Sequence, residues 1–573
     1  MRVSRADFAV AATLLWFASP ALAQLGPPVP LAPPPARQAP APAAPPTAPA
    51  APVVSTSGDD INATPLAPMD ASWVGTLGPA DNALPHAMWA STPRAMVAAA
   101  LPLLQPTTSP TLQDLARRLL LTDAMPPLGQ DAPGKPGLAE LRLNRLLALG
   151  RIDGVKLIDT LPQLNTGEAF DRDTIELRVA ANDSDSACRV VRDRVARYRN
   201  PWWDRALIAC QALSGAYDQA ALGLSIMRDQ PPTTRDPVFE ALVENILGHR
   251  QAVDKLPDPT PMRVALLAAA KLPLPADTLA AAGPAALVVW ATSDKVPAMQ
   301  RLGAAEKAMA FGALPPDALG LLYASIEATP QERATILKNG KPQEDSRGRA
   351  ILYDIARTST GAARAVALAP LFADARRRGA FVTTARLVAP LIAELQPGPD
   401  MQGFAGDAAR ALLAARDIDH ALPWIDLANG AELRVIAALA QSGHVEGADV
   451  ELSAAAAALS ARDANAAPRQ IDLLAALSSA LGEKLGDVDV APLLLPNHQA
   501  LVPGGALWLD QQQAAAGGRV GETVLTSLLI AAAGDHLTPE PVLLARVVAG
   551  LKAVGLESDA RALAVEAALS AGI

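Results

Sequence analysis

The stretch LSGAYDQAALGLSI, residues 213–226, is one copy of a pattern that recurs along the chain. The pattern is small–Gly–x–hydrophobic–x–x–Ala, and the glycine of this copy is Gly215. Glycine adopts the left-handed conformation that ends many helices, and a small residue lets the next helix pack closely. The pattern therefore predicts the turn of a helical hairpin. Further copies contain Gly150, Gly379, Asp417 in place of glycine, Gly443 and Gly555.

The composition favours helices over strands. Aromatic residues make up 3% of the 573-residue chain, and Ala and Leu supply most of the apolar content. Ala, Leu, Arg and Glu are strong helix formers, whereas β-sandwiches depend on β-branched and aromatic residues. Helix starts with a polar cap followed by proline are predicted at Thr92-Pro93, Ser109-Pro110, Asn200-Pro201, Thr329-Pro330 and Thr538-Pro539.

The recurring turn resembles the inter-helix turn of tetratricopeptide repeats (TPR) and the Ala-rich superhelix of some periplasmic murein enzymes. The copies are irregularly spaced, and the Trp, Tyr and Pro signature of a true tetratricopeptide array is absent. We therefore expect an all-α fold, an irregular TPR-like α-solenoid of helical hairpins, over residues 69–573. It would be one array or two lobes, 69–338 and 349–573.

The first 68 residues predict an export signal and a linker. Residues 1–23 carry Arg2 and Arg5, a short apolar run and the small residues Ala21 and Ala23, which together are typical of a signal peptide. Residues 24–68 are rich in Pro and Ala, a composition that favours an extended, disordered segment. We read it as a tether or, alternatively, as a PxxP-type ligand. The predicted location is periplasmic or secreted.

Charge and hydropathy exclude several classes of partner. The formal net charge is -9, which argues against nucleic acid because nucleic-acid-binding proteins present a basic face. Hydrophobic residues make up 50% of the chain, but charged residues or prolines interrupt every apolar run after the signal before it is long enough to cross a membrane. We expect no integral membrane span in the mature chain.

The two cysteines, Cys188 and Cys210, predict a disulfide. A helix from Ser184, a turn at 199–200 and a second helix from Pro201 would place them opposite each other in an antiparallel hairpin. The bridge would close a loop of about 23 residues and contribute about 3 kcal/mol on the chain-entropy model. The alternatives are a redox-active pair, which lacks the C-x-x-C spacing, and two free buried thiols.

The sequence lacks the patterns of common catalytic and metal sites. The six histidines form no H-x-x-x-H or H-E-x-x-H spacing, and the G-x-S-x-G, G-x-G-x-x-G and P-loop patterns are absent. Glu557-Ser558 resembles the catalytic dipeptide of lytic transglycosylases, but too little chain follows it to build their catalytic domain. The alternative is an exposed glutamate at a helix start. We expect no enzyme activity, no cofactor and no metal.

Trp202 and Trp203 are the candidate anchor for a partner or a sugar. The alternative is that one tryptophan packs on the neighbouring hairpin and the other covers its edge. Residues 88–127 and the region of Cys210 resemble exported, Ala-rich bacterial proteins of unknown function, some of which are labelled antifreeze glycopeptide-like. This resemblance implies no activity. We expect a non-catalytic scaffold or adaptor for an envelope protein or peptide; the alternative is a murein- or glycan-binding accessory of a cell-wall enzyme.

Overall fold

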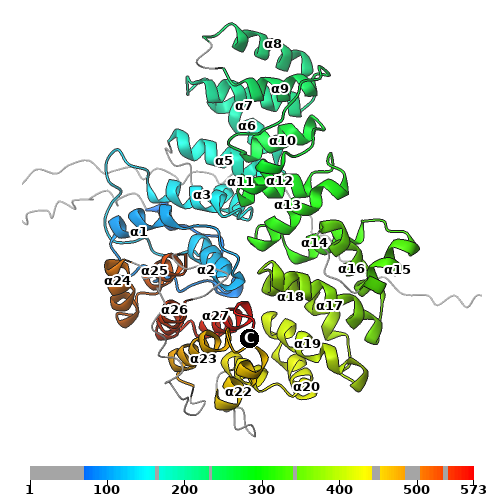
Figure 1. Ribbon diagram of the computed structural model, residues 1–573. Helices are drawn as coiled ribbons and strands as arrows, with labels where there is room; N and C mark the ends of the chain where they lie inside the picture. Colours follow the sequence, from blue (N-terminus) through cyan, green and yellow to red (C-terminus); the bar gives the residue numbers. More distant parts are fainter. Residues whose placement is uncertain are drawn as a thin grey trace, which may run out of the picture. The chain divides into compact units, whose positions relative to one another are not determined.

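The computed structural model describes residues 70–161, 167–231, 235–339, 345–441, 452–483, 504–532 and 540–573. These residues form 27 α-helices and short 3-10 turns, with no β-strand among them (Figure 1). Two isolated bridges, Leu77–Thr122 and Pro93–Leu128, are the extended pairings in this part of the chain. The all-α prediction is confirmed. The predicted signal at 1–23 and linker at 24–68 lie outside the described residues.

Six helical hairpins share one turn. In each hairpin three residues separate the two helices. The second of the three has a positive φ, and the third directly precedes the second helix. The backbone N–H of this third residue donates to the carbonyl five residues earlier, as in the Schellman motif. One example is Ala216 N, which donates to Gln211 O at 2.9 Å. The six pairs are α5 (Glu168–Ala180) and α6 (Ser184–Arg194), α7 (Pro201–Leu213) and α8 (Tyr217–Arg228), α17 (Gly361–Arg377) and α18 (Phe381–Ala393), α19 (Gln402–Ala414) and α20 (Ile418–Ala428), α24 (Gly505–Ala516) and α25 (Val520–Ala532), and α26 (Pro541–Ala553) and α27 (Glu557–Ser570).

The recurring sequence pattern marks four of these six turns, with one correction. The turns at Asn182 and Gly518 were not predicted, and the predicted copy at Gly150, with φ of 67°, lies in a longer connection between α3 and α4. Gly215, Gly379 and Gly555 have φ of 80°, 63° and 84°. In the α19–α20 turn the left-handed residue is Arg416, with φ of 64°, and Asp417 is the N-cap of α20, accepting from His420 N. The sequence analysis placed Asp417 in the glycine position, one residue too late, because the aspartate was the conspicuous turn residue. Gly443 lies outside the described residues.

The remaining helices lie before, between and after these hairpins. The list is α1 (Arg94–Ala100), α2 (Pro110–Leu121), α3 (Leu138–Ala148), α4 (Gly154–Thr160), α9 (Pro237–Ile246), α10 (Pro261–Ala269), α11 (Ala276–Ala281), α12 (Pro284–Thr292), α13 (Ala298–Ala310), α14 (Pro316–Ala324), α15 (Pro330–Asn339), α16 (Ser346–Thr358), α21 (Ala431–Ala440), α22 (Leu452–Arg462) and α23 (Ala467–Leu481).

Three of the predicted polar caps are present. The Ser109 side chain accepts from Leu112 N at the start of α2, Asn200 accepts from Trp202 N at the start of α7, and Thr329 forms a capping box with Glu332 at α15. Thr92 is not a cap, because the chain turns there and α1 begins at Arg94 after the N-cap Pro93. Thr538 lies outside the described residues, and α26 begins at Pro541 rather than at residue 539.

Alanine carries much of the helix packing. In α19 the side chains of Ala405, Ala408, Ala409 and Ala411 are fully buried beside Leu412. Small side chains let neighbouring helix axes approach closely, and α19 accordingly packs against α18, α20, α21 and α27. The apolar core runs through the helical array from Trp73 to Ile573.

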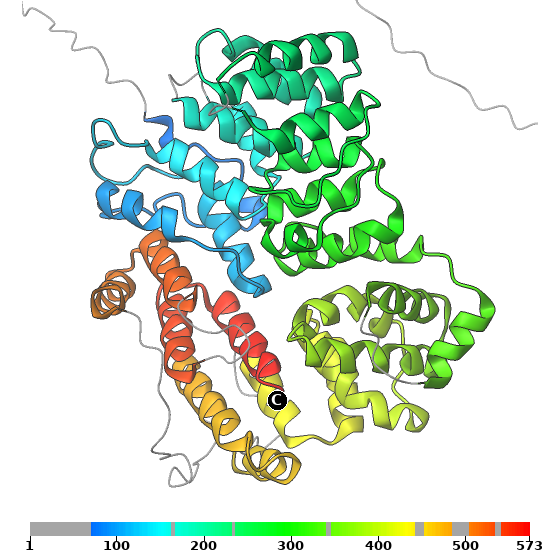
Figure 2. The same cartoon turned by 45° about the horizontal axis from the view of Figure 1, so that its top comes forward.

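The last helices pack against one of the first. Helix α2 contacts both α25 and α27, and Figure 2 shows the red and orange C-terminal helices beside the blue N-terminal segment. A buried ion pair joins Arg118 of α2 to Asp559 of α27, with 2.6 Å between Nη2 and Oδ2. Gln113 of α2 also donates to Ala310 O at the end of α13, at 2.8 Å. The array of hairpins therefore closes on itself, with α2 at the closing point.

The division into lobes 69–338 and 349–573 stays a prediction. Helices α14 and α16 pack against each other across the proposed boundary, and so do α14 and α18. None of the described helices is both long and apolar enough to cross a membrane.

Candidate functional site

A cavity of about 640 Å³ lies where the array closes. Its wall is formed by the start of α2, the end of α13, the α17–α18 turn and parts of α25, α26 and α27. We call it the inner chamber. Ligand pockets in proteins commonly enclose about 300–1,000 Å³ and carry a few polar groups among apolar ones. The inner chamber has this size and this lining.

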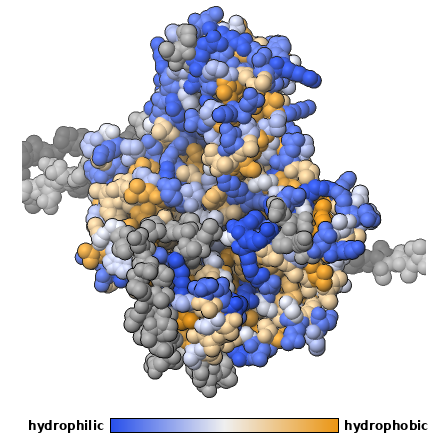
Figure 3. Space-filling view, viewed as in Figure 1, coloured by the Kyte–Doolittle hydropathy of each residue, from blue (hydrophilic) through white to orange (hydrophobic). Residues whose placement is uncertain are grey.

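The apolar part of the inner chamber comes from six segments of the chain. Its lining includes Leu112 of α2, Phe311 after α13, Val382 of α18, Ile530 of α25, Leu543 of α26 and Leu563 of α27. On the outer face that Figure 3 shows, hydrophobic and hydrophilic residues are intermixed. The chamber therefore gathers apolar side chains from segments more than 400 residues apart in the sequence at one place.

Glu566 of α27 is a buried carboxylate in the chamber wall. It accepts hydrogen bonds from Ser109 Oγ at 2.6 Å, from Thr111 Oγ1 at 2.7 Å and from Thr111 N at 3.0 Å, which are groups at the start of α2. Arg416 donates in turn to Thr111 Oγ1 at 2.9 Å. Burial raises the pKa of Glu566, while these hydrogen bonds and the nearby arginines act to lower it. The carboxylate therefore caps α2 across the closing point.

Glu306 of α13 also borders the chamber, and its carboxylate has partners on both oxygens. Tyr323 Oη donates to Oε1 at 2.6 Å, Ser346 Oγ donates to Oε2 at 2.9 Å, and Arg349 donates to both, at 2.9 and 2.7 Å. Burial, followed by the charge of Glu306, raises the pKa of Tyr323 well above its ordinary value. This network joins α13 to α14 and α16, and it gives both carboxylate oxygens of Glu306 hydrogen-bond partners.

A second cavity of about 370 Å³ adjoins the inner chamber, since Pro110 and Thr383 line both. Arg151 and Arg386 supply guanidinium groups to it. Arg151 donates to Gly312 O at 2.8 Å. Arg386 has no hydrogen-bond or ion-pair partner among the described residues, and it is exposed, whereas its helix neighbours Leu387 and Val388 are buried. It is the exposed, unpaired cation of this cavity.

The two tryptophans of the predicted anchor pack edge to face, with ring centres 4.9 Å apart, but they differ in burial. Trp203 is fully buried, stacks on Tyr198 and donates from Nε1 to Glu168 Oε1 at 3.1 Å. Trp202 is half-buried, with the guanidinium of Arg172 4.8 Å from its ring centre. It borders an open groove of about 1,040 Å³. Trp203 is a core residue, so Trp202 alone lies where a partner could reach it.

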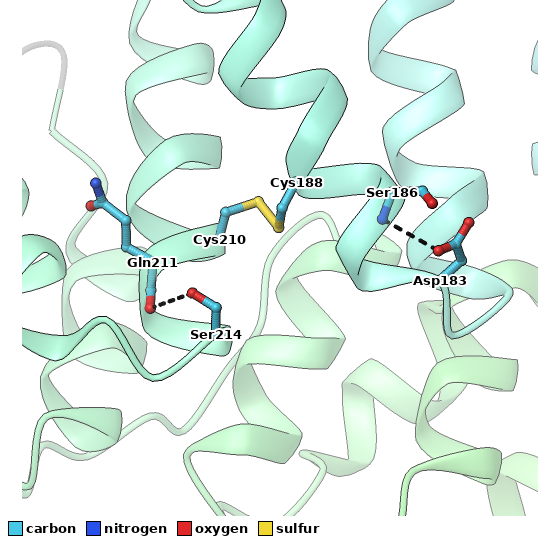
Figure 4. The surroundings of a disulfide bond; sticks show 6 residues. All are labelled: Asp183, Ser186, Cys188, Cys210, Gln211 and Ser214. Carbon is cyan, nitrogen blue, oxygen red and sulfur yellow. Dashed lines mark hydrogen bonds between the residues drawn. A yellow bond between two sulfur atoms is a disulfide. The ribbon is translucent and has the colours of Figure 1, made fainter.

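The disulfide between Cys188 and Cys210 is present, with the Cα atoms 5.4 Å apart. It joins α6 to α7 (Figure 4), as the hairpin argument predicts. The first helix is shorter than expected and ends at Arg194 rather than near Tyr198. Figure 4 also shows the cap of α6, in which Asp183 accepts from Ser186 N.

Glu557 lies at the first position of α27, where its carboxylate pairs with Arg561 at 2.8 Å. The hydrogen bond from Arg561 lowers the pKa of Glu557. Glu557 therefore lies at a helix start, as in the alternative to a catalytic glutamate that the sequence analysis gave. Among the described residues, no group of three or more His, Cys, Asp or Glu side chains is arranged to hold a metal ion.

The sequence analysis missed Arg386, Glu306 and Glu566. A signal for Glu566 was present, because RALAVEAALSAGI at 561–573 contains one acidic residue in an otherwise apolar run after Arg561. A lone charge on a buried helix face requires a partner, but the partner here lies about 455 residues away. Arg386, in FVTTARLVAPLI at 381–392, is likewise a lone charge in an apolar run, but it lies on the exposed side of α18.

Comparison with known proteins places the chain in no family. No family model, no curated protein and no solved structure matches it. The fold itself defines the class: an all-α protein of irregular, TPR-like helical hairpins whose ends pack together around a chamber. The resemblance to exported Ala-rich bacterial proteins stays a prediction.

Proposed function

We propose that this protein is an exported, non-catalytic scaffold or adaptor that binds an envelope protein or peptide, and that the inner chamber is its binding surface. The observation that carries the proposal is the chamber, with its volume of about 640 Å³ and its apolar lining from six segments of the chain. Repeat arrays commonly bind extended partners on their inner surfaces. The disulfide is consistent with an oxidising compartment.

The chamber chemistry supports binding more than catalysis. The carboxylate of Glu566 is buried at a helix start, and that of Glu306 is enclosed by Tyr323, Ser346 and Arg349. A general acid or base must reach the proton that it transfers. Both carboxylates already hold helices together, so neither is placed to serve a substrate.

Photo-crosslinking in cells tests this proposal. A photo-reactive amino acid would replace Leu544, a half-buried chamber residue of α26, or Leu222, a residue of α8 with 63% exposure. We expect one reproducible envelope protein to be captured from position 544 and not from position 222. Equal capture from the two positions, or capture only from position 222, would contradict a role for the chamber.

A second candidate function is glycan binding at Trp202. The groove beside this residue also presents Asn200, Asp236 and Arg263, and carbohydrate sites combine an aromatic face with such planar polar groups. Sedimentation with purified sacculi tests it: Trp202→Ala should lower the bound fraction, whereas Leu222→Ala should leave it unchanged. If wild-type protein stays in the supernatant, this candidate is wrong.

A further inference from the structure

The inner chamber is lined by three carboxylates, and each of them already has partners within the protein. Glu306 and Glu566 accept hydrogen bonds from side chains of neighbouring helices. Glu540, directly before α26, accepts from Arg469 Nη2 at 3.1 Å. The negative charges of the chamber wall are therefore engaged before any ligand binds.

The two cations of the chamber lining are engaged as well. Lys307 Nζ donates to the backbone carbonyls of Leu279 and Ala280, at 2.8 and 2.6 Å. Arg378 Nε donates to Asp374 Oδ2 at 2.7 Å. Among the described residues that line the chamber, none is an unpaired cation or an unpaired carboxylate. Because a charge removed from water needs a partner, the part of a ligand that lies inside this chamber is uncharged.

The apolar wall extends past the chamber on one side. A narrow crevice of about 20 Å³ adjoins it there, and Leu112 and Phe311 line both spaces. The crevice adds Leu104, Leu149 and Leu528 to the apolar surface. This continuation suits an elongated apolar ligand better than a compact one.

The lining also distinguishes a hydrocarbon chain from a segment of polypeptide. Each residue of a polypeptide brings a backbone N–H and a C=O, which need hydrogen-bond partners once they are removed from water. The charged side chains of the chamber already use their hydrogen-bonding groups within the protein. A hydrocarbon chain needs no such partner, and each methylene that it buries favours binding through the hydrophobic effect.

We propose that the inner chamber binds the acyl chain of a lipid-modified envelope protein. This inference rests on the proposed function, because it names the part of the partner that enters the chamber. A chain joined to its protein through an amide or an ester is uncharged at the junction, whereas a free fatty acid brings a carboxylate for which the described lining holds no unpaired cation. The chain would lie along Leu112, Phe311 and Leu543, with the protein outside the chamber.

Isothermal titration calorimetry of the full chain with defined probes tests the proposal. The probes are one hexapeptide of Gly and Ser with amide-linked acyl chains of increasing length, from octanoyl to palmitoyl, all below the concentration at which they form micelles. We expect the affinity to rise about fourfold with each added methylene and to level off once the chain is longer than the chamber. The acetylated hexapeptide should not bind, and free palmitate should bind more weakly than the palmitoyl peptide.

A matched pair of variants locates the site. Ala531→Trp places an indole in the chamber from α25 and should lower the affinity for the palmitoyl peptide about tenfold or more. Ala221→Trp, the same substitution at an exposed position of α8, should leave the affinity unchanged. The chain-length series uses the wild-type protein alone, so it decides the question even where Ala531→Trp fails to fold.

Several results would overturn the inference. They are an affinity that does not depend on chain length, equal binding of the acetylated hexapeptide, an unchanged affinity in folded Ala531→Trp, and binding of free palmitate in place of the palmitoyl peptide. Crosslinking at Leu544 decides the proposed function separately. Capture of an envelope protein without an acyl chain would retain that function and overturn this inference alone.

Discussion

Glu176 should make the stability of this protein fall as the pH rises from acidic to neutral. The residue lies in α5, is almost fully buried, and accepts from Met262 N at the start of α10, with 2.8 Å between Met262 N and Oε2. Burial raises its pKa from 4.5 to about 7; the charge of Asp173 also raises it, while hydrogen bonds from Met262 and Thr260 and the charge of Arg263 lower it.

The direction and the size of this change in the free energy of unfolding follow from proton linkage. Between 4.5 and about 7 the folded protein holds a proton on Glu176 that the unfolded chain has released. The free energy of unfolding therefore decreases as the pH rises through this range and is level above it. The difference between the two pKa values corresponds to roughly 3 kcal/mol at about 1.36 kcal/mol per pKa unit.

The variant Glu176→Gln tests this reasoning, because the amide oxygen can still accept from Met262 N but does not titrate. Urea unfolding followed by circular dichroism at about pH 5 and about pH 8 gives the free energy of unfolding of each protein. Relative to the wild type, the variant should gain roughly 2.5 kcal/mol between the two pH values, because about pH 5 already lies above the unfolded pKa of 4.5. The control Glu327→Gln, which removes an exposed glutamate, should gain nothing. Parallel pH profiles for wild type and Glu176→Gln would refute the argument.

Three other substitutions probe the disulfide, the closing point and the hairpin turn. Replacing both cysteines with alanine should lower the free energy of unfolding by about 3 kcal/mol and remove the effect of reductant on the melting temperature. Arg118→Ala would leave Asp559 buried without its partner, which should cost roughly 3–5 kcal/mol and speed amide hydrogen exchange in α27. Gly150→Ala should destabilise more than Gly215→Ala in thermal unfolding. Both glycines have positive φ, but an added Cβ at position 150 would lie 2.6 Å from Pro284 Cβ, whereas position 215 has open space.

Each of these expectations has a contradicting result. A melting temperature that responds to reductant equally in the cysteine-free variant would show that the bridge does not stabilise the fold. Unchanged amide hydrogen exchange in α27 after Arg118→Ala would show that the ion pair between Arg118 and Asp559 does not stabilise the contact between α2 and α27. Equal destabilisation by the two alanine substitutions would mean that backbone strain, rather than contact with Pro284, sets the cost at Gly150.

Four of the six hairpin turns were predicted, because every group that builds such a turn lies within six residues. Gly215 supplies the left-handed residue, and Ala216 N closes the turn on Gln211 O. The disulfide was predictable for the same reason, since one short turn relates Cys188 to Cys210. The offset between Arg416 and Asp417 shows the limit of this reading. An arginine gives no turn signal, yet Arg416 adopts the left-handed conformation directly before the aspartate cap.

The inner chamber was not predictable, because its walls come from both ends of the chain. Glu566 and Ser109 meet across 457 positions, and no local pattern in either segment specifies the other. The sequence could at most show that a charge lay on an apolar helix face. The same holds for Arg386, whose lack of a partner becomes visible only when its neighbours in space are known.

The helix starts nevertheless contain information about long-range contacts. Helices α2, α10 and α15 each begin with Ser or Thr followed by Pro, which leaves the amide of the next residue as the first free donor. Helix α15 has Glu332 at its third position and completes a capping box locally.

Helices α2 and α10 have Leu112 and Arg263 at that third position, so neither can form the local box. Each instead receives a buried carboxylate from another helix on the amide of its second residue: Glu566 on Thr111 N and Glu176 on Met262 N. In this chain a Ser/Thr–Pro helix start without an acid three positions after its cap thus receives a carboxylate from elsewhere in the fold, whereas the Asn–Pro and Asp–Pro starts of α7 and α9 are capped by their own side chains. Among the described residues, the two Ser/Thr–Pro starts of this kind mark the point where the array closes and the packing of α10 on α5.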